Sequence, residues 1–272
     1  MNLLYLLFTF AVLFCLYLWL IAPRLYNRPD FAPVMRQPMY AHRGLHNNKS
    51  GIPENSLAAF SRAIQHGYGI ELDVHLTKDN IPVVFHDDTL LRMCGTAGRL
   101  KDYTFEELKR LRLLDTTQTI PSLREVLELT DGKVPLIVEL KAEGNSKLLC
   151  ETVNRSLSAY RGVYCIESFF PQVLYWYRRN RPDIIRGQLS TDFIKENGSC
   201  IAHVLLTCLL SNFFSRPDFI AYNHKFAQNL SLRLCVKLFH ALPAAWTVRT
   251  EEELNQARQF FKLFIFEKES IT

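Results

Sequence analysis

The sequence predicts an α/β fold in which a parallel sheet closes into a barrel, preceded by one membrane-spanning helix. Short β-rich runs alternate with helical stretches over most of the chain, and an uncharged apolar segment begins at residue 3. Strands separated by helices are typical of a parallel sheet. With 272 residues, 48% of them hydrophobic, the chain can bury one large core, and α/β barrels of this size fold as single domains.

The apolar segment, residues 3–22, is long enough to cross about 30 Å of hydrocarbon as a helix that rises about 1.5 Å per residue. A cleaved signal peptide is the alternative, but the segment lacks a basic start and a small-residue cleavage site. Arg24, Arg28 and Arg36 follow it, and no Lys or Arg precedes it. The positive-inside rule therefore predicts a single-pass cell-membrane protein with a cytoplasmic C-terminal domain.

The rest of the chain divides into a linker and one folded domain. Residues 23–37 include prolines and arginines that disfavour a continuous helix. We therefore predict a transmembrane anchor over residues 1–22, a juxtamembrane linker over residues 23–37 and a barrel domain over residues 38–272.

Nine β-rich runs are predicted to be strands, whereas a closed barrel of this type needs about eight. One run is therefore expected to be accessory, and the run with the weakest pattern is Phe219–Tyr222. The predicted strands are Met39–Ala41, Ile70–Leu76, Pro82–Phe85, Leu136–Leu140, Val163–Ile166, Ile184–Leu189, Phe219–Tyr222, Ala245–Val248 and Leu263–Phe266.

Several helix starts carry capping residues. Ser56 precedes an apolar-periodic stretch over residues 57–66, while Thr104 with Glu107, like Ser122 with Glu125, has the spacing of a capping box.

Charge and cysteine content limit the class of protein. The formal net charge is +5 without a Lys/Arg run of the nucleic-acid-binding type, which favours anionic lipid headgroups as partners over nucleic acid. The 7 cysteines form no C-x-x-C pair, and this usage indicates reduced thiols in a domain that faces the cytosol.

Two predicted strands carry acidic residues at a spacing of two. Glu71 and Asp73 share one face of the strand over residues 70–76, and Glu139 and Lys141 repeat the spacing at the end of the strand over residues 136–140. Carboxylates that face one cavity repel each other, and Mg²⁺ or Ca²⁺, which prefer oxygen ligands, would relieve that repulsion. The alternative is ordinary alternation on amphipathic strands with solvated acids.

Two histidines follow other predicted strands. His42 and Arg43 end the first strand and His86 ends the third, and strand ends host the active sites of α/β barrels. Two histidines can exchange protons near neutral pH, while Arg43 and Lys141 can hold phosphate oxygens. A histidine that stands alone is more often structural, but here both accompany the acidic pairs.

Several motifs recur in a particular order: His42-Arg43-Gly44, Pro53-Glu54-Asn55-Ser56, Glu71-x-Asp73-Val74, Thr77-Lys78-Asp79, Pro82-Val83-Val84 with His86-Asp87, and Glu139-x-Lys141. In order and spacing they resemble the glycerophosphodiester phosphodiesterase family. A weaker resemblance continues through Ser168-Phe169 and Gly187-x-Leu189 to Trp246-Thr247-Val248, and the whole covers residues 38–267.

The resemblance implies a TIM-type (β/α)8 barrel that hydrolyses glycerophosphodiesters, or lysophospholipids, with a divalent metal ion. It implies a role for each motif residue: metal ligation by Glu71, Asp73 and Glu139, proton exchange by His42 and His86, phosphate binding by Arg43 and Lys141, and support of the site by Glu54 and Asn55. Trp246 either lines the glycerol pocket or fills the barrel.

The sequence also departs from the family pattern. Arg249 stands where the family commonly has Asn, and the acidic closing turn is represented only by Glu267. Because of these departures, the resemblance does not assign the residues of the rim that select the substrate.

Residues 200–214 are strongly apolar yet just short of a membrane span, so they form either a barrel helix with a broad apolar face or an element that dips into lipid.

Two other functions remain alternatives: a related barrel of the phospholipase D or phosphatidylinositol phospholipase type, and a non-catalytic membrane scaffold. A scaffold is expected to lose a metal carboxylate or a histidine, and this chain retains them all.

Overall fold

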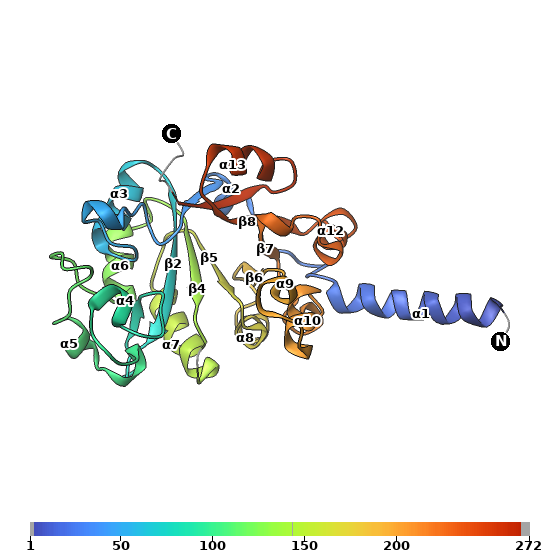
Figure 1. Ribbon diagram of the computed structural model, residues 1–272, viewed down its shortest axis with the longest axis horizontal. Helices are drawn as coiled ribbons and strands as arrows, with labels where there is room; N and C mark the ends of the chain where they lie inside the picture. Colours follow the sequence, from blue (N-terminus) through green and yellow to red (C-terminus); the bar gives the residue numbers. More distant parts are fainter. Residues whose placement is uncertain (1–2, 143, 268–272) are drawn as a thin grey trace.

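The computed structural model describes residues 3–142 and 144–267, and its centre is a closed barrel of parallel strands (Figure 1). Hydrogen bonding from β1 to β9 on one side and from β1 to β2 on the other closes the ring. The barrel strands are β1 (Met39–Ala41), β2 (Gly69–Leu76), β4 (Leu136–Leu140), β5 (Tyr164–Ser168), β6 (Arg186–Ser190), β7 (Phe219–Asn223), β8 (Leu242–Val248) and β9 (Leu263–Phe266). The predicted TIM-type barrel is confirmed.

The accessory strand is β3 (Pro82–Val84), which pairs with β2 in the antiparallel direction. The strand pattern singled out Phe219–Tyr222 as the weakest strand, and that prediction is wrong. The turn 77–81 between β2 and β3 is too short for the crossover that a parallel neighbour needs. In contrast, β7 lies between β6 and β8, and Phe219–Tyr222 is buried, as expected for a central strand covered on both faces.

An outer layer of helices surrounds the barrel. Its longer members are α3 (Leu57–Gln65), α6 (Leu123–Thr130), α7 (Ser146–Ser158), α8 (Pro171–Asn180), α12 (Leu230–Lys237) and α13 (Glu251–Ala257). Ser56 caps α3 by accepting from the Ala59 N–H, and the Ser122/Glu125 capping box at α6 is complete, as predicted. Short elements fill the connections: α2 (Ala32–Met35), η1 (Asn48–Ser50), α4 (Leu91–Cys94), η2 (Leu100–Asp102), α5 (Phe105–Leu108), α9 (Phe193–Asn197), α10 (Ile201–Thr207), α11 (Asn212–Ser215) and η3 (His224–Phe226).

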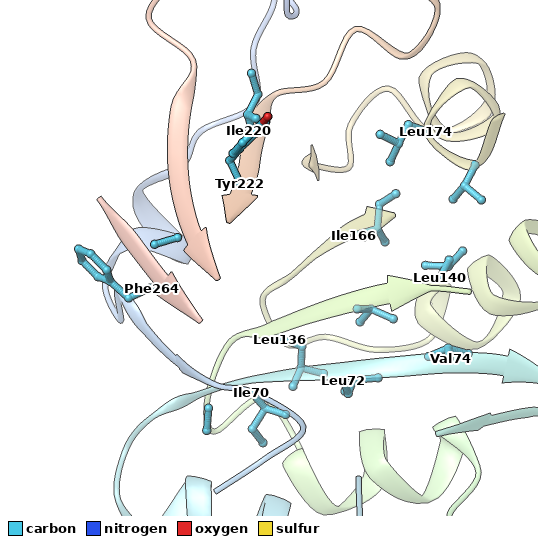
Figure 2. Close-up of a cluster of buried hydrophobic side chains, with 14 of the residues drawn as sticks. Ile70, Leu72, Val74, Leu136, Leu140, Ile166, Leu174, Ile220, Tyr222 and Phe264 are labelled. Atoms are coloured by element: carbon cyan, nitrogen blue, oxygen red, sulfur yellow. The ribbon is translucent and has the colours of Figure 1, made fainter. Parts of the chain in front are cut away.

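Side-chain alternation along the strands separates the apolar layer from the barrel interior. Ile70, Leu72 and Val74 of β2 pack outward with Leu136 and Leu140 of β4, in the cluster beneath the helices (Figure 2). Because successive side chains on a strand point to opposite faces, the residues between them point into the barrel. This alternation directs polar side chains of β2 and β4 inward.

Residues 82–120 form an insertion between β2 and α6 that has an apolar cluster of its own. Val83, Phe85, Met93, Leu108 and Ile120 are among its buried members. The insertion packs beside β2, and it carries His86 back toward the barrel mouth, since the Phe85 N–H donates to the carbonyl of Asp73.

The apolar helix α1 (Leu3–Ile21) projects from the side of the barrel near α10 and α12 (Figure 1). It has the length and composition of a membrane span, and only 6% of its most apolar window is buried. Such a helix near the N-terminus is either an anchor or a signal sequence. Its last residue, Ile21, is buried in the helical layer, where its carbonyl accepts from the Asn212 side chain.

The predicted single apolar element over residues 200–214 is instead two short helices, α10 and α11, separated by a turn at Leu209 and Leu210. Leu209 adopts a positive φ of 54° and is fully buried. Ile201 remains exposed on α10 and Phe213 on α11.

Candidate active site

The three predicted metal ligands lie together inside the barrel. Glu71 and Asp73 project inward from β2, and the parallel register places Glu139 of β4 directly beside Asp73. One carboxylate oxygen from each residue lies within 4.8 Å of the others, and all three side chains are buried. Two adjacent strands with the same alternation are therefore sufficient to assemble the triad.

The charges around this triad are unevenly compensated. Burial, reinforced by the neighbouring carboxylates Asp73 and Glu139, raises the pKa of Glu71 well above its usual range. Burial also acts on Asp73, but the charges of Lys141, Arg43 and the two histidines together outweigh it and hold the pKa of Asp73 well below its usual range. Lys141 Nζ lies 2.9 Å from Asp73 Oδ1 and 2.8 Å from Glu139 Oε1.

A divalent cation fits this donor set. Carboxylate oxygens are the ligands that Mg²⁺ and Ca²⁺ prefer. Glu167 of β5 is a further buried acid. Burial, and then the nearby charge of Glu139, raise the pKa of Glu167 well above its usual range. Its Oε2 has no hydrogen-bond partner among the described residues. Buried acids thus outnumber the local cations, which is the situation that a bound cation relieves.

Arg43 follows β1 at the barrel mouth and contacts the triad. Its backbone N–H donates to Glu71 Oε2 over 2.9 Å, its Nη1 donates to Glu54 over 2.7 Å, and its Nε lies 3.5 Å from Asp73. The turn depends on Gly44, which has a φ of 79°. A Cβ at Gly44 would lie 2.8 Å from the ring of Phe60, so the turn admits no side chain there.

The two residues predicted to support the site do contact its members. Asn55 donates from Nδ2 to Asp73 Oδ2 over 2.8 Å. Glu54 accepts from Arg43 and also from Arg92 of α4, whose Nη2 lies 2.7 Å from Glu54 Oε1. Sequence reasoning missed Arg92 because no motif includes it.

His42 lies between two acids. Its Nδ1 lies 2.7 Å from Glu267 Oε1, and its Nε2 lies 3.9 Å from Glu71 Oε2. Burial lowers the pKa of His42 to about 4, with the adjacent Arg43 charge acting in the same direction and Glu267 opposing both. Arg249 in turn donates to Glu267 over 2.8 Å. The two departures from the family pattern, Arg249 and Glu267, therefore contact each other, and Glu267 links them to His42.

His86, which lines the same cavity, has a matching arrangement. Its Nδ1 lies 2.7 Å from Asp87 Oδ1, and Arg92 donates to the same carboxylate. A carboxylate can only accept, so Nδ1 is the donor in this bond. Asp87 therefore orients the ring of His86. His75 is buried, and its Nε2 lies 3.1 Å from the His86 carbonyl.

Both histidines, the inner triad members Glu71 and Glu139, and Lys141 line one cavity of about 150 Å³. Its wall includes Trp246, whose ring stacks edge-to-face against Phe169 with centroids 5.5 Å apart. Trp246 therefore faces the cavity. The second half of the chain contributes this apolar wall and Glu167, which period-two spacing along β5 could have revealed.

The mouth of this TIM-type barrel contains a buried carboxylate triad, two histidine–acid pairs and two cations. These groups define the class of protein as a phosphate-ester-binding barrel. The model of the glycerophosphoryl diester phosphodiesterase family matches residues 42–262. The chain belongs to this family, which confirms the resemblance seen in the motifs.

Proteins that are similar in sequence support the assignment. The chain is 34% identical over 158 residues to human glycerophosphodiester phosphodiesterase 1, a match that covers 53% of this chain and 46% of the relative. It is 43% identical over 116 residues to glycerophosphodiester phosphodiesterase from Caldanaerobacter subterraneus, covering 40% of this chain and 46% of the relative. The matched regions thus span about half the length of these relatives.

Solved structures match over nearly their full length. A phosphodiesterase from Oleispira antarctica in complex with the product sn-glycerol-3-phosphate has a TM-score of 0.69 at 26% identity, covering 84% of this chain and 92% of that one. A glycerophosphodiester phosphodiesterase from Thermotoga maritima has a TM-score of 0.65 at 24% identity, covering 85% and 94%, and this second likeness concerns the fold alone.

Proposed function

We propose that this protein is a metal-dependent phosphodiesterase that hydrolyses glycerophosphodiesters to glycerol 3-phosphate and an alcohol. The observation that carries the proposal is the convergence of Glu71, Asp73 and Glu139 at a cavity that His42 and His86 also line. The named activity of the family members supports it. So does the product held by the Oleispira antarctica phosphodiesterase.

In this proposal Glu71, Asp73 and Glu139 hold Mg²⁺ or Ca²⁺, which supplies a Lewis acid and a template for the diester. One histidine accepts the proton of the glycerol 2-hydroxyl as that oxygen attacks phosphorus, and the other protonates the alcohol whose bond to phosphorus breaks. The resulting cyclic phosphate is opened by water with the proton roles reversed. His42 and His86 suit this exchange because each has its Nδ1 bonded to a carboxylate, which orients the ring.

Arg43 and Lys141 have the charge to bind phosphate oxygens. Lys141 lines the cavity and sits between Asp73 and Glu139, so it can meet a phosphoryl oxygen while it balances both acids. Trp246 and Phe169 provide an apolar wall for the glycerol carbons.

Release of sn-glycerol 3-phosphate from a soluble glycerophosphodiester tests the function. Activity is expected in the wild type, with loss in His42→Ala, in Glu71→Ala and after chelation of divalent metal. His66→Ala, an exposed histidine on the C-terminal end of α3, is the matched control and should retain activity. Equal rates in the wild type and both site variants would overturn the assignment.

We also propose that α1 anchors the protein in the cell membrane with the barrel in the cytoplasm, and that lysophospholipids are among its substrates. The support is the apolar length of α1 together with two exposed apolar side chains, Ile201 and Phe213. The centre of the Phe213 ring lies 5.8 Å from that of Trp19 in α1. Proteolysis of sealed cells tests the orientation, because an externally digested barrel would contradict it.

Replacement of Ile201 and Phe213 by Ser should reduce hydrolysis of vesicle-borne lysophospholipid and leave hydrolysis of a soluble diester unchanged. Phe214 is a poor choice for this test because it stacks on Tyr175 at 4.0 Å and its loss would disturb packing. Unchanged activity on vesicles would remove lysophospholipid access through this surface.

A further inference from the structure

A second polar cavity, of about 410 Å³, lies where α1 meets the barrel. It is far from the catalytic mouth in the fold, because Arg186 begins β6 and Asp218 directly precedes β7, which places both at the amino ends of the strands. The mouth lies at the carboxyl ends. The cavity is lined by Trp19, Ala22, Pro23, Leu25, Tyr26, Pro182 and the arginines Arg24, Arg178, Arg186 and Arg216.

The charge in this cavity is strongly positive. Its described lining contains no Asp or Glu, and the nearest paired acid is Asp218, which lies 3.4 Å from Arg24 and 3.5 Å from Arg186. The guanidinium groups act on one another: burial first, and then the Arg178 charge, lower the pKa of Arg216. One carboxylate shared by several arginines leaves a local excess of positive charge.

Two of these arginines, Arg178 and Arg216, are held in place by hydrogen bonds to backbone carbonyls. Arg216 donates from Nη1 to the carbonyls of Trp19 and Ala22, and its guanidinium lies 5.2 Å from the centre of the Trp19 ring. Arg178 donates from Nη1 to the carbonyls of Phe213 and Phe214. The other nitrogens of these two guanidinium groups make no hydrogen bond within the described residues, so the forks are oriented yet available to an anion.

The position of the cavity along α1 indicates what that anion is. The inference rests on the proposed insertion of α1 in the membrane. A helix of 19 residues is about 28 Å long, close to the thickness of the hydrocarbon layer. Trp19 lies at the barrel end of α1, and aromatic side chains gather at the membrane interface. The arginines that line the cavity with Trp19 therefore stand at the level of the lipid headgroups.

We propose that this cavity binds the phosphate of an anionic phospholipid of the surrounding leaflet. Arg24 already donates from Nε to the Tyr26 carbonyl and from Nη1 to the Pro182 carbonyl and Asp218, so within the described residues only its Nη2 remains for a ligand. The lipid phosphate accepts from this nitrogen and from the remaining donors of Arg178 and Arg216, and its acyl chains extend along α1. Because Arg216 also holds the C-terminal carbonyls of α1, the bound lipid fastens the helix to the barrel.

The test measures lipid binding by the full-length protein in nonionic detergent, titrated with phosphatidylglycerol or with phosphatidylcholine and followed by native mass spectrometry. Phosphatidylglycerol should bind in preference to phosphatidylcholine. Arg178→Gln and Arg24→Gln should each weaken phosphatidylglycerol binding by about fivefold, while Arg124→Gln, which removes an exposed arginine of α6, should leave it unchanged. Equal binding of both lipids, or binding that is indifferent to Arg178 and Arg24, overturns the proposal.

Two further arms distinguish a lipid site from a site for free phosphate and from a folding defect. Inorganic phosphate that displaces phosphatidylglycerol at equal concentration would identify a site for free phosphate and contradict a lipid site. Thermal unfolding shows whether Arg178→Gln disturbs α11, and Arg24→Gln, whose residue lies outside α11, gives an independent reading of the same site. Because binding is measured in detergent, failure of membrane insertion, seen by cell fractionation, is distinguishable from failure of the lipid site.

Discussion

Glu54 offers the sharpest test of how the site is held together. It is 5% exposed, it bonds to Arg43 at the barrel mouth, and it also bonds to Arg92 of the insertion. Burial raises the pKa of Glu54, but the hydrogen bonds of Arg92 and the charge of Arg43 outweigh it and lower the pKa from 4.5 to about 2. Glu54→Gln keeps the shape of the side chain and removes the charge.

The expected loss of stability follows from that pKa. Each pKa unit is worth about 1.4 kcal/mol, so the fall from 4.5 to about 2 corresponds to roughly 3 kcal/mol at neutral pH. A carboxylate whose pKa is depressed by folding stabilises the protein above its unfolded pKa, and this contribution is lost as the pH falls through the folded pKa. The difference between wild type and Glu54→Gln should therefore shrink between about pH 4.5 and pH 2, to less than half near pH 3.

The assay is thermal unfolding of the detergent-solubilised protein at neutral pH and near pH 3. A loss of roughly 3 kcal/mol lowers the unfolding midpoint by about 6–12 °C for a domain of this size. Glu128→Gln removes an exposed acid that pairs with Arg124 one helical turn away, and it should change the midpoint little at either pH. A Glu54→Gln midpoint that equals the wild type at neutral pH, or a difference that does not depend on pH, would refute the reasoning.

Three other predictions follow from contacts in the site. Glu267→Gln should lower kcat/KM on a soluble diester by roughly 10- to 100-fold, because His42 loses a charge-assisted bond worth about 1.5–3 kcal/mol. Arg249→Gln should cost less than about fivefold, because Arg249 is a largely exposed residue of the cavity rim whose ion pair with Glu267 is screened by water. Equal effects of the two substitutions would contradict this order. Glu71→Gln should reduce the bound Mg²⁺ or Ca²⁺ measured by elemental analysis after dialysis, and undiminished metal would exclude Glu71 as a ligand. Gly44→Ala should lower the free energy of unfolding by roughly 2–4 kcal/mol, because the positive φ of Gly44 and the nearby Phe60 ring leave no room for a methyl group. Thermal unfolding measures this loss, and a midpoint equal to that of the wild type would show that the turn relaxes.

The parts of this fold that depend on local sequence were predictable. Capping by Ser56 and the Ser122/Glu125 box mark helix starts through interactions within one turn. The pairing direction of β3 depends on the length of the turn that follows β2, and the strand pattern alone does not report it. For this reason the strand pattern indicates Phe219–Tyr222 as the accessory strand, whereas the structure has Pro82–Val84 in that role.

The same distinction applies to the site. Glu71, Asp73 and Glu139 could be grouped from the sequence, because a period of two on adjacent strands fixes their direction. The acid that pairs with His42 could not, since Glu267 reaches it only when β9 closes the barrel against β1. Arg92 likewise depends on how the insertion folds back over β2.

These closing contacts give the two halves of the site different dependencies. His42 is oriented by the end of the last barrel strand through Glu267, so its geometry requires a closed ring. His86 is oriented by Asp87, which Arg92 ties to Glu54 and thereby to Arg43 beside the triad. A disturbance confined to the insertion should therefore misplace His86 and Arg43 together while His42 keeps its partner. The insertion between β2 and α6 is thus an integral part of the catalytic architecture that we propose, and its sequence is constrained by the site as well as by its own apolar cluster.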